Sequence, residues 1–454
     1  MQFLAHHAVS CKTSQSKFLM RKWKEKLARF GIKLHIIKDG GGVMMDFRSR
    51  VSKGAKRLKS SLIRELLKYS NVPGIISFGG GVPDPETFPR EELAEIARKV
   101  IMDEYRFSLQ YGTTEGDPLL KEQYIRYIEK YYGIHGLTPD NLLITVGSQQ
   151  ALDLIGRVFL DEESIIAMSA PAYLGAISAF RVASPKVISV PLQEDGMDLD
   201  YLEERLRKLS PEELKKFKFV YVVPNFHNPA GVTLSLEKRK RLLEMAGKFD
   251  FFIVEDDPYG ALRFEGDPIP SIYELGGKER VVLLNTFSKV LCPGLRIGLV
   301  IGDEEVIKLL VKAKQGADLC SPSLTQRITA RYLEAYDLLE KLKTTLELYR
   351  EKKDIMMEAF EKYLKDLDVS WVNPQGGLFS WLTFPEDINT LEMLDVGKDK
   401  GIIWIPGEAF YIDGSGKNHM RVSFCLPPKE DIVEGARRLR ETVLAYKKIR
   451  AQVR

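Results

Sequence analysis

Residues 285–298 have the sequence NTFSKVLCPGLRIG. An apolar run, 281–284, comes directly before this stretch, and a second run, 297–301, begins inside it. Short apolar runs closed by polar or glycine-containing loops are typical of buried strands. The pattern therefore places Lys289 just after a strand, with Arg296 seven residues further on, beside a Pro-Gly pair. Most lysines are surface charges, but the spacing S-K-x-x-x-P-G-x-R-x-G argues against a chance arrangement.

Further apolar runs of the same kind surround this stretch. Between about residues 90 and 310 they alternate with helical patterns, and each is closed by a Gly, Pro, Asn or Asp loop. The runs are residues 142–146, 164–168, 219–223, 251–254, 281–284 and 297–301. This alternation predicts an α/β fold in which a mostly parallel sheet has helices on both faces.

The flanking parts of the chain have other patterns. Residues 305–365 predict long helices, and the apolar runs 377–382, 402–405 and 420–424 predict a smaller α+β domain. Ser60 and Ser61 predict the capped start of a helix, and residues 75–78 predict a strand that leads into the glycines 79–81. We expect four regions: a basic N-terminal extension at 1–43, an N-terminal part of the small domain at 44–95, a large domain at 96–334, and the C-terminal part of the small domain at 335–454.

The extension 1–43 is rich in lysine and arginine and poor in acids. It has three interpretations: a nucleic-acid-binding arm, a solvated tail, or a segment that is not natural protein, with translation starting at Met44 or Met45. The run Gly-Gly-Gly-Val before Met44 can be encoded by a purine-rich ribosome-binding site, so we prefer the third. The nucleic-acid arm comes last, because charge runs are usually solvated.

Composition narrows the class of protein. A chain of 454 residues is too long for one hydrophobic core, and its net charge of +4 does not indicate a nucleic-acid surface. The four cysteines form no C-x-x-C pair, and the six histidines form no metal pattern, so we expect no zinc site, no disulfide framework and a cytoplasmic location. No secretory h-region and no uncharged apolar stretch long enough for a bilayer is present, so no membrane partner is expected.

The stretch around Lys289 resembles the cofactor-lysine signature of the class I and II aminotransferases of pyridoxal-phosphate (PLP) fold type I. The resemblance covers roughly residues 55–450, and the nearest branch is that of the kynurenine, 2-aminoadipate and aromatic aminotransferases. It implies a large domain with a mostly parallel mixed sheet flanked by helices, and a smaller α+β domain built from both chain ends. It also implies PLP as the cofactor, held by Lys289 as a Schiff base.

The resemblance gives Lys289 a second role as proton shuttle, and it assigns Arg296 and Ser288 to the cofactor phosphate. The chemistry fits these residue types. A lysine amine must be neutral to react with an aldehyde, and partial burial beside a cation lowers its pKa enough. The planar guanidinium fork of arginine matches a phosphate.

Residues 254–259, VEDDPY, follow another predicted strand. Two adjacent acids before a proline are by themselves only a turn signal. PLP withdraws electrons well only while its ring nitrogen stays protonated, and a carboxylate against that nitrogen keeps it so. By resemblance Asp256 is this carboxylate and Tyr259 contacts the ring hydroxyl oxygen. Asp257 is the competitor, and the three-residue step to Tyr259 favours Asp256.

Three more strand ends carry candidate cofactor contacts. In residues 224–231, PNFHNPAG, Asn228 resembles the amide that contacts the ring hydroxyl oxygen, although N-P-x-G alone is a turn signal. Ser148 and Gln149 open a predicted helix and resemble the family's phosphate cup, because a helix N-terminus attracts anions. Alone, they would be an ordinary N-cap. Tyr173 would stack on the cofactor ring, although such aromatics more often serve packing.

Tyr111 resembles a tyrosine that reaches into the neighbouring subunit's phosphate site, which implies a homodimer. On the substrate side, Arg421 resembles the anchor for the α-carboxylate, where a bidentate pair is suitable. A surface arginine at a strand edge is the alternative. Asn228 would share the substrate contact, and Arg64, Gly81 and Phe379 would line the same mouth.

The expected reaction is a two-step transfer of an amino group from an amino acid to a 2-oxo acid. By resemblance the donor is of the aromatic, kynurenine or 2-aminoadipate type and the acceptor is 2-oxoglutarate. Another PLP reaction, such as C–S lysis or decarboxylation, is the first alternative. A transcription regulator with an aminotransferase-like domain is the second, but about 43 residues are short for a DNA-binding winged helix.

Overall fold

The computed structural model describes residues 35–36, 43–44, 47–58, 66, 68 and 72–453. The chain divides into two units, Met1–Leu58 and Lys59–Arg454. The first contains the antiparallel pair β1 (His35–Ile36) and β2 (Val43–Met44), the 3-10 helix η1 (Phe47–Arg50) and α2 (Lys53–Lys56). The predicted helix start at Ser60 and Ser61 lies outside the described residues, and so does most of the predicted extension. The second unit carries all the elements that follow.

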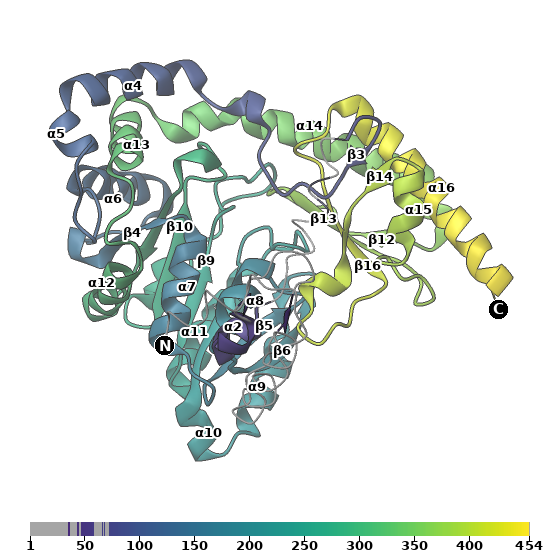
Figure 1. Ribbon diagram of the computed structural model, residues 1–454, viewed down its shortest axis with the longest axis horizontal. Helices are drawn as coiled ribbons and strands as arrows, with labels where there is room; N and C mark the ends of the chain where they lie inside the picture. Colours follow the sequence, from purple (N-terminus) through teal and green to yellow (C-terminus); the bar gives the residue numbers. More distant parts are fainter. Residues whose placement is uncertain are drawn as a thin grey trace, which may run out of the picture. The chain divides into compact units, whose positions relative to one another are not determined.

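An eight-stranded mixed sheet is the centre of the second unit (Figure 1). Its order is β4-β11-β10-β9-β8-β5-β6-β7, and six of these strands run parallel, while β11 and the short β7 run antiparallel to their neighbours. The strands are β4 (Leu142–Val146), β5 (Ile165–Ala170), β6 (Lys186–Gln193), β7 (Gly196–Met197), β8 (Phe217–Val222), β9 (Phe252–Asp256), β10 (Val281–Thr286) and β11 (Ile297–Ile301). The predicted fold class is confirmed.

Successive strand residues enter two separate cores, which shows that helices cover both faces of the sheet. Phe219 and Tyr221 of β8 pack in one cluster with α7, α8 and α12, whereas Val220 and Val222 pack in the other with α4, α6, α9, α11 and α13. The helices are α4 (Arg90–Asp103), α5 (Tyr105–Ser108), α6 (Pro118–Tyr132), α7 (Ser148–Phe159), α8 (Leu174–Arg181), α9 (Leu199–Arg207), α10 (Pro211–Lys216), α11 (Leu236–Phe249), α12 (Glu304–Asp318) and α13 (Ser323–Ala335).

A smaller antiparallel sheet of order β12-β13-β16-β15 stands beside the large one and packs with three helices (Figure 1). The short strand β3, near the N-terminal side, pairs in parallel with β14, so both chain ends build this domain. The elements are β3 (Ile76–Ser77), β12 (Ser370–Trp371), β13 (Phe379–Thr383), β14 (Ile402–Ile403), β15 (Ile405–Pro406), β16 (His419–Ser423), α14 (Leu338–Leu364), α15 (Met393–Asp399) and α16 (Lys429–Val453).

Strands β6 and β7 are additions to the six strands of this sheet that the sequence predicts, and β6 is the longer of the two. Strand β6 contains Pro191 and alternates exposed and buried residues, because it lies near the sheet edge rather than in its centre. The parallel strands β4, β5, β8, β9 and β10 end at one edge of the sheet. In open α/β sheets ligands bind beyond such carboxyl ends, so the loops at this edge define the candidate site.

Candidate active site

Lys289 follows β10 in a half-buried position at this edge. Its Nζ donates to the carbonyl oxygen of Gly81 at 3.1 Å, so the glycine loop after β3 lies directly over the amine. Burial lowers the pKa of Lys289 to about 8, and the positive charges of Arg421 and Arg296 add to this effect. A minor but much enlarged fraction of the amine is therefore neutral near physiological pH, and the neutral amine is the form that reacts with an aldehyde.

Arg421 projects from β16 of the small sheet and is buried. One terminal nitrogen donates to Asn228 Oδ1 at 2.9 Å and the other to the carbonyl oxygen of Gly79 at 2.9 Å, while buried Nε has no partner. Its guanidinium carbon lies 4.3 Å from the ring centre of Phe379 and 5.3 Å from that of Phe410. Burial lowers its pKa to about 10, so Arg421 stays a cation at neutral pH.

Asn228 and Tyr259 connect this arginine to the strand ends of the large sheet. Both side chains are buried, and the Asn228 amide donates to the Tyr259 hydroxyl at 3.2 Å. The Tyr259 ring meets Phe379 edge to face at 5.9 Å between centres. A Cβ on Gly81 would lie 3.2 Å from the Phe379 ring and 3.3 Å from an Arg421 nitrogen. The structure thus brings five of the predicted substrate and cofactor residues into one cluster.

Asp256 ends β9 as a buried carboxylate with one free position. Its Oδ2 accepts from the Tyr221 hydroxyl at 2.8 Å, whereas its buried Oδ1 has no partner. Burial raises its pKa to about 7. The competitor Asp257 accepts from the Gly260 backbone at 2.8 Å and is also hydrogen-bonded by Asn225. Of these two acids, Asp256 is therefore the one that offers a buried, unsatisfied oxygen to a cationic ring nitrogen.

The predicted phosphate residues gather at the N-terminus of α7. Arg296 donates to Ser288 Oγ at 3.4 Å and to the carbonyl oxygen of Val146 at 3.1 Å. The helix cap Gly147 has φ +71°, and a Cβ there would lie 2.3 Å from an Arg296 nitrogen, so glycine permits this close approach. Ser148 opens the helix. A guanidinium, a hydroxyl and a helix N-terminus together suit a phosphate.

Gln149 and Tyr173 lie beside this phosphate end. The Gln149 amide donates to the carbonyl oxygen of Gly175 at 2.9 Å, one residue into α8, whose N-cap is Tyr173. The half-buried Tyr173 is close enough to the cluster for its charges to act on it. Burial raises the pKa of Tyr173 to about 12. The negative charge of Asp256 also raises this pKa, and the positive charge of Arg421 lowers it.

One predicted site residue, Tyr111, stands apart from this cluster. Tyr111 is 79% exposed, and its described contact is a backbone hydrogen bond to the Gln110 side chain at 2.9 Å, so it joins no residue of the cluster within one chain. Arg64 lies outside the described residues.

Sequence reasoning missed three supporting residues. Tyr221 fixes Asp256, and its position inside an apolar strand was a usable signal, because a buried tyrosine hydroxyl needs a partner. His227 contacts Ser169 Oγ through Nε2 at 2.9 Å, and burial lowers its pKa to about 3, so it is neutral. Arg239 is fully buried and donates to Asn225 Oδ1 at 2.7 Å. No local pattern marked the last two.

Comparison with known proteins identifies the family to which this chain belongs. The sequence model described as "Aminotransferase class I and II" matches residues 74–439. The chain belongs to the class I and II aminotransferases. It is 43% identical to aromatic-amino-acid aminotransferase 1 of Thermococcus litoralis, over 88% of this chain and 95% of that one.

Solved structures agree with this assignment. The kynurenine aminotransferase of Pyrococcus horikoshii, solved with PMP, is 42% identical at a TM-score of 0.84, over 88% of this chain and 98% of that one. The alpha-aminoadipate aminotransferase of Thermus thermophilus, solved with N-(5'-phosphopyridoxyl)-L-leucine, is 38% identical at a TM-score of 0.82, over 89% and 100%. This aminotransferase therefore transfers amino groups of amino acids with pyridoxal 5'-phosphate, and C–S lysis or gene regulation is not favoured.

The residues present fit this cofactor at each of its ends. The unsatisfied oxygen of Asp256 suits the ring nitrogen, and the Asn228–Tyr259 pair suits the ring hydroxyl oxygen. Arg296, Ser288 and the N-terminus of α7 suit the phosphate, and the Lys289 amine suits the aldehyde. Within the described part of the chain, no three His, Cys, Asp or Glu side chains gather as metal ligands, and no helix has the length and apolar character needed to cross a bilayer.

Proposed function

We propose that Lys289 holds PLP, that Asp256 and Tyr259 tune its ring, and that Arg421 anchors the α-carboxylate of the amino acid. Ser148, Gln149, Ser288 and Arg296 bind the phosphate, Tyr173 stacks on the ring, and Asn228 contacts both ring hydroxyl and substrate. One observation carries this proposal: the amine of Lys289 and the guanidinium of Arg421 are held by carbonyls of the same glycine loop, Gly81 and Gly79.

The bound cofactor supplies an aldehyde for the amino group and an electron-poor ring that stabilises negative charge at Cα. Lys289 Nζ then has two tasks. It would hold the cofactor until an amino acid binds, and as a neutral amine it would accept the Cα proton and give it back. Arg421 fixes the carboxylate by a bidentate pair, which orients the Cα–H bond toward that amine and supplies a large part of the rate.

We assign the donor to the aromatic, kynurenine or 2-aminoadipate type and the acceptor to 2-oxoglutarate. The three relatives compared above act on donors of these three types by name. The chain's own support is the apolar wall around Arg421, formed by Phe379 and Phe410, with Gly81 leaving room beside the first ring. Arg64 stays part of this proposal on the strength of the family resemblance alone.

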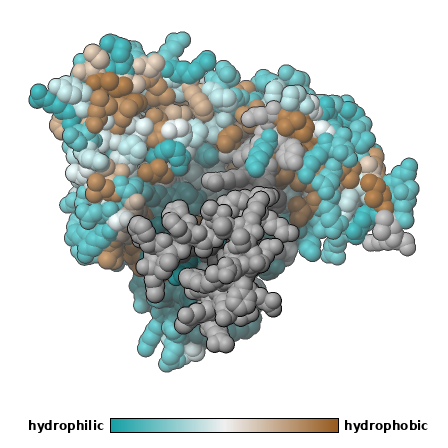
Figure 2. Space-filling view, viewed as in Figure 1, coloured by the Kyte–Doolittle hydropathy of each residue, from teal (hydrophilic) through white to brown (hydrophobic). Residues whose placement is uncertain are grey.

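We further propose a homodimer in which Tyr111 contacts the cofactor phosphate of the other subunit. Its 79% exposure means that the side chain is free to extend from its own chain. Neighbouring apolar side chains are also exposed, namely Met102 64%, Phe107 68% and Leu109 61%. Figure 2 shows apolar atoms gathered in this part of the surface, over the ribbons of α4 and α5 in Figure 1. Such a patch is typical of a protein–protein contact.

A cytoplasmic location belongs to the same proposal. The three cysteines whose surroundings are described, Cys292, Cys320 and Cys425, form no disulfide. Widely spaced, reduced cysteines are usual in the cytoplasm.

A panel of amino donors and 2-oxo acids, run on wild-type protein and on Lys289→Ala, tests the reaction. We expect turnover with aromatic, kynurenine or 2-aminoadipate donors, strict dependence on the acceptor, and no turnover in Lys289→Ala, because Lys289 supplies the amine that contacts the Gly81 carbonyl at this edge of the sheet. Lys308→Ala is the matched control, since Lys308 is an exposed lysine on α12. Retained turnover in Lys289→Ala, or product formation without an acceptor, would overturn the proposal.

A further inference from the structure

The segment that carries Tyr111 runs from Glu104 to Asp117. It exposes apolar side chains, but contacts from a neighbouring helix hold it in place. Glu104 stands at its start, between α4 and α5, and Asp117 stands at its end as the N-cap of α6. Between them lie Phe107, Leu109 and Tyr111, all more than 60% exposed. A segment with so little burial of its own side chains depends on other contacts for a fixed conformation.

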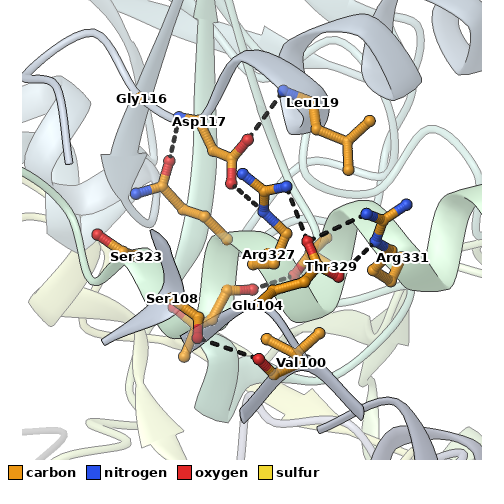
Figure 3. A network of polar contacts seen from close by, with 12 residues as sticks. Val100, Glu104, Ser108, Gly116, Asp117, Leu119, Ser323, Arg327, Thr329 and Arg331 are labelled. Carbon is orange, nitrogen blue, oxygen red and sulfur yellow. Dashed lines mark hydrogen bonds and ion pairs between the residues drawn. The ribbon is translucent and has the colours of Figure 1, made fainter. Parts of the chain in front are cut away.

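Those contacts come from one face of α13. Ser323, Arg327 and Arg331 recur every four residues, so they lie in a row along the helix. Ser323 Oγ donates to the carbonyl oxygen of Gln110 at 2.8 Å, directly before Tyr111. Figure 3 shows the two arginines of this row turned toward the carboxylates at the segment's ends.

Arg327 joins both ends of the segment. Its Nε donates to Asp117 Oδ2 at 2.8 Å and its Nη1 donates to Glu104 Oε2 at 3.0 Å. The Arg327 side chain is only 12% exposed, and its guanidinium carbon also lies 5.3 Å from the ring centre of Phe107. Arg331 adds a fork to Glu104, at 2.8 and 3.0 Å, but does not reach Asp117. Within this described network, Arg327 is thus the one residue of the row that binds both ends of the segment, Glu104 and Asp117.

We propose that the row Ser323–Arg327–Arg331 is a positioning element for the partner subunit's active site, with Arg327 as its principal residue. It holds the Tyr111 segment in the conformation that delivers the hydroxyl to the cofactor phosphate across the dimer. The inference rests on the proposed homodimer. Its distinctive consequence is that the row acts on the site of the other subunit and not on the site of its own chain.

Mixed dimers distinguish an effect on the partner subunit's site from an effect on the site of the same chain. Two differently tagged chains are co-expressed, and dimers that carry both tags are purified and loaded with PLP. In the first mixed dimer, one chain carries Lys289→Ala together with Arg327→Met and the other is wild-type. In the second, one chain carries Lys289→Ala and the other carries Arg327→Met. Each dimer has a single working lysine, and only in the first does the altered Tyr111 segment belong to the chain opposite it.

We expect the first mixed dimer to lose the visible absorbance of its lysine-bound cofactor about tenfold faster on dilution than the second, because a hydrogen bond to a charged phosphate is weakened. The second should match a reference dimer with Lys289→Ala in one chain only. KM for the amino acid should change little, since the substrate end is not involved. Equal losses in both mixed dimers, or a loss confined to the second, would overturn the inference.

The same pair of dimers built with Tyr111→Phe in place of Arg327→Met tests the proposed homodimer on its own. If Tyr111→Phe acts across the dimer and Arg327→Met does not, the inference fails while the proposed arrangement stands. If Tyr111→Phe has no effect in either dimer, the arrangement itself fails.

Milder variants keep the test decisive if Arg327→Met does not give folded protein. Ser323→Ala removes only the hydrogen bond beside Tyr111, and Arg327→Lys keeps the charge but loses the fork that spans two carboxylates. Both variants should also speed the loss of absorbance in the first mixed dimer, but by a smaller factor. The effect of Arg331→Met on cofactor loss should be smaller than that of Arg327→Met, because Arg327 still binds Asp117. The opposite ranking would contradict the assigned role of Arg327.

Discussion

Arg421 and Arg327 are both largely buried, yet their partners differ in charge. Arg327 forms ion pairs with Glu104 and Asp117, so its charge is balanced inside the chain. Arg421 meets only the amide of Asn228, the carbonyl of Gly79 and two aromatic rings, and its Nε is unsatisfied. Among the described residues no carboxylate pairs with it.

The charge of the partners distinguishes an anchor for a ligand from a structural clamp. Burying a cation without an anion costs free energy, and a chain tolerates that cost where a ligand anion completes the site. Arg421 is therefore arranged for an external carboxylate, whereas Arg327 is arranged for two internal ones. Substitution of each by methionine should separate the two roles, since one variant should lose binding and the other should lose stability.

The largest effect is expected for Arg421→Met. We expect kcat/KM for the amino acid to fall by roughly 100-fold or more, equivalent to about 3 kcal/mol, because a buried charge pair with the substrate is lost. Thermal stability of the cofactor-free protein should stay the same or rise, since an uncompensated buried cation is removed. Steady-state kinetics and thermal melts check both points. A strongly destabilised variant with intact kcat/KM would show that Arg421 is structural.

A smaller effect is expected for Arg327→Met, with the opposite signature. The free energy of unfolding should fall by about 2 kcal/mol, because partly buried Asp117 loses its ion pair and Glu104 keeps only its pair with Arg331. The KM for the amino acid should stay near the wild-type value. Denaturant unfolding measures the loss, and Arg157→Met, which removes an exposed pair with Asp153, is the control with little expected change. Equal stability of the two variants would contradict the clamp.

The smallest effect concerns the pKa of Lys289. Capture of PLP by the cofactor-free protein needs the neutral amine, so its rate should rise with pH and level off above a midpoint near 8, instead of rising toward the usual lysine value of 10.5. Arg421→Met should move the midpoint to higher pH, because a nearby cation that lowers the pKa is gone. Arg327→Met should leave it in place. Stopped-flow absorbance at a series of pH values gives the midpoints. An unshifted midpoint in Arg421→Met would show that the charge of Arg421 does not act on Lys289.

Much of the fold and of the cluster could be predicted because the signals are local. Six strands were legible as apolar runs, and Lys289, Asp256 and Asn228 lie within five residues of the ends of the runs 281–284, 251–254 and 219–223. Parallel strands end at one edge, so residues far apart in sequence were expected together, and the structure places them so. Tyr111 and Arg64 rest on resemblance, and their roles stay predictions.

Other features depend on contacts that no local pattern encodes. Arg327 lies 210 positions after Asp117 and 223 after Glu104, and each of the three side chains alone resembles an ordinary surface charge. Strand β6 was missed because it lies near the sheet edge, where buried and exposed residues alternate and a residue such as Pro191 is tolerated. Tyr221 was hidden inside a strand that apolar patterning had already explained, although its hydroxyl fixes Asp256.

The most direct test of the account is to find which side chain carries the cofactor. PLP-loaded protein is reduced with borohydride, which makes the link to an amine permanent, and is then digested for peptide mass mapping. We predict a phosphopyridoxyl group on Lys289 and on no other lysine. A modified lysine elsewhere, or protein that takes up no PLP, would contradict the assignment of Lys289 as the cofactor lysine.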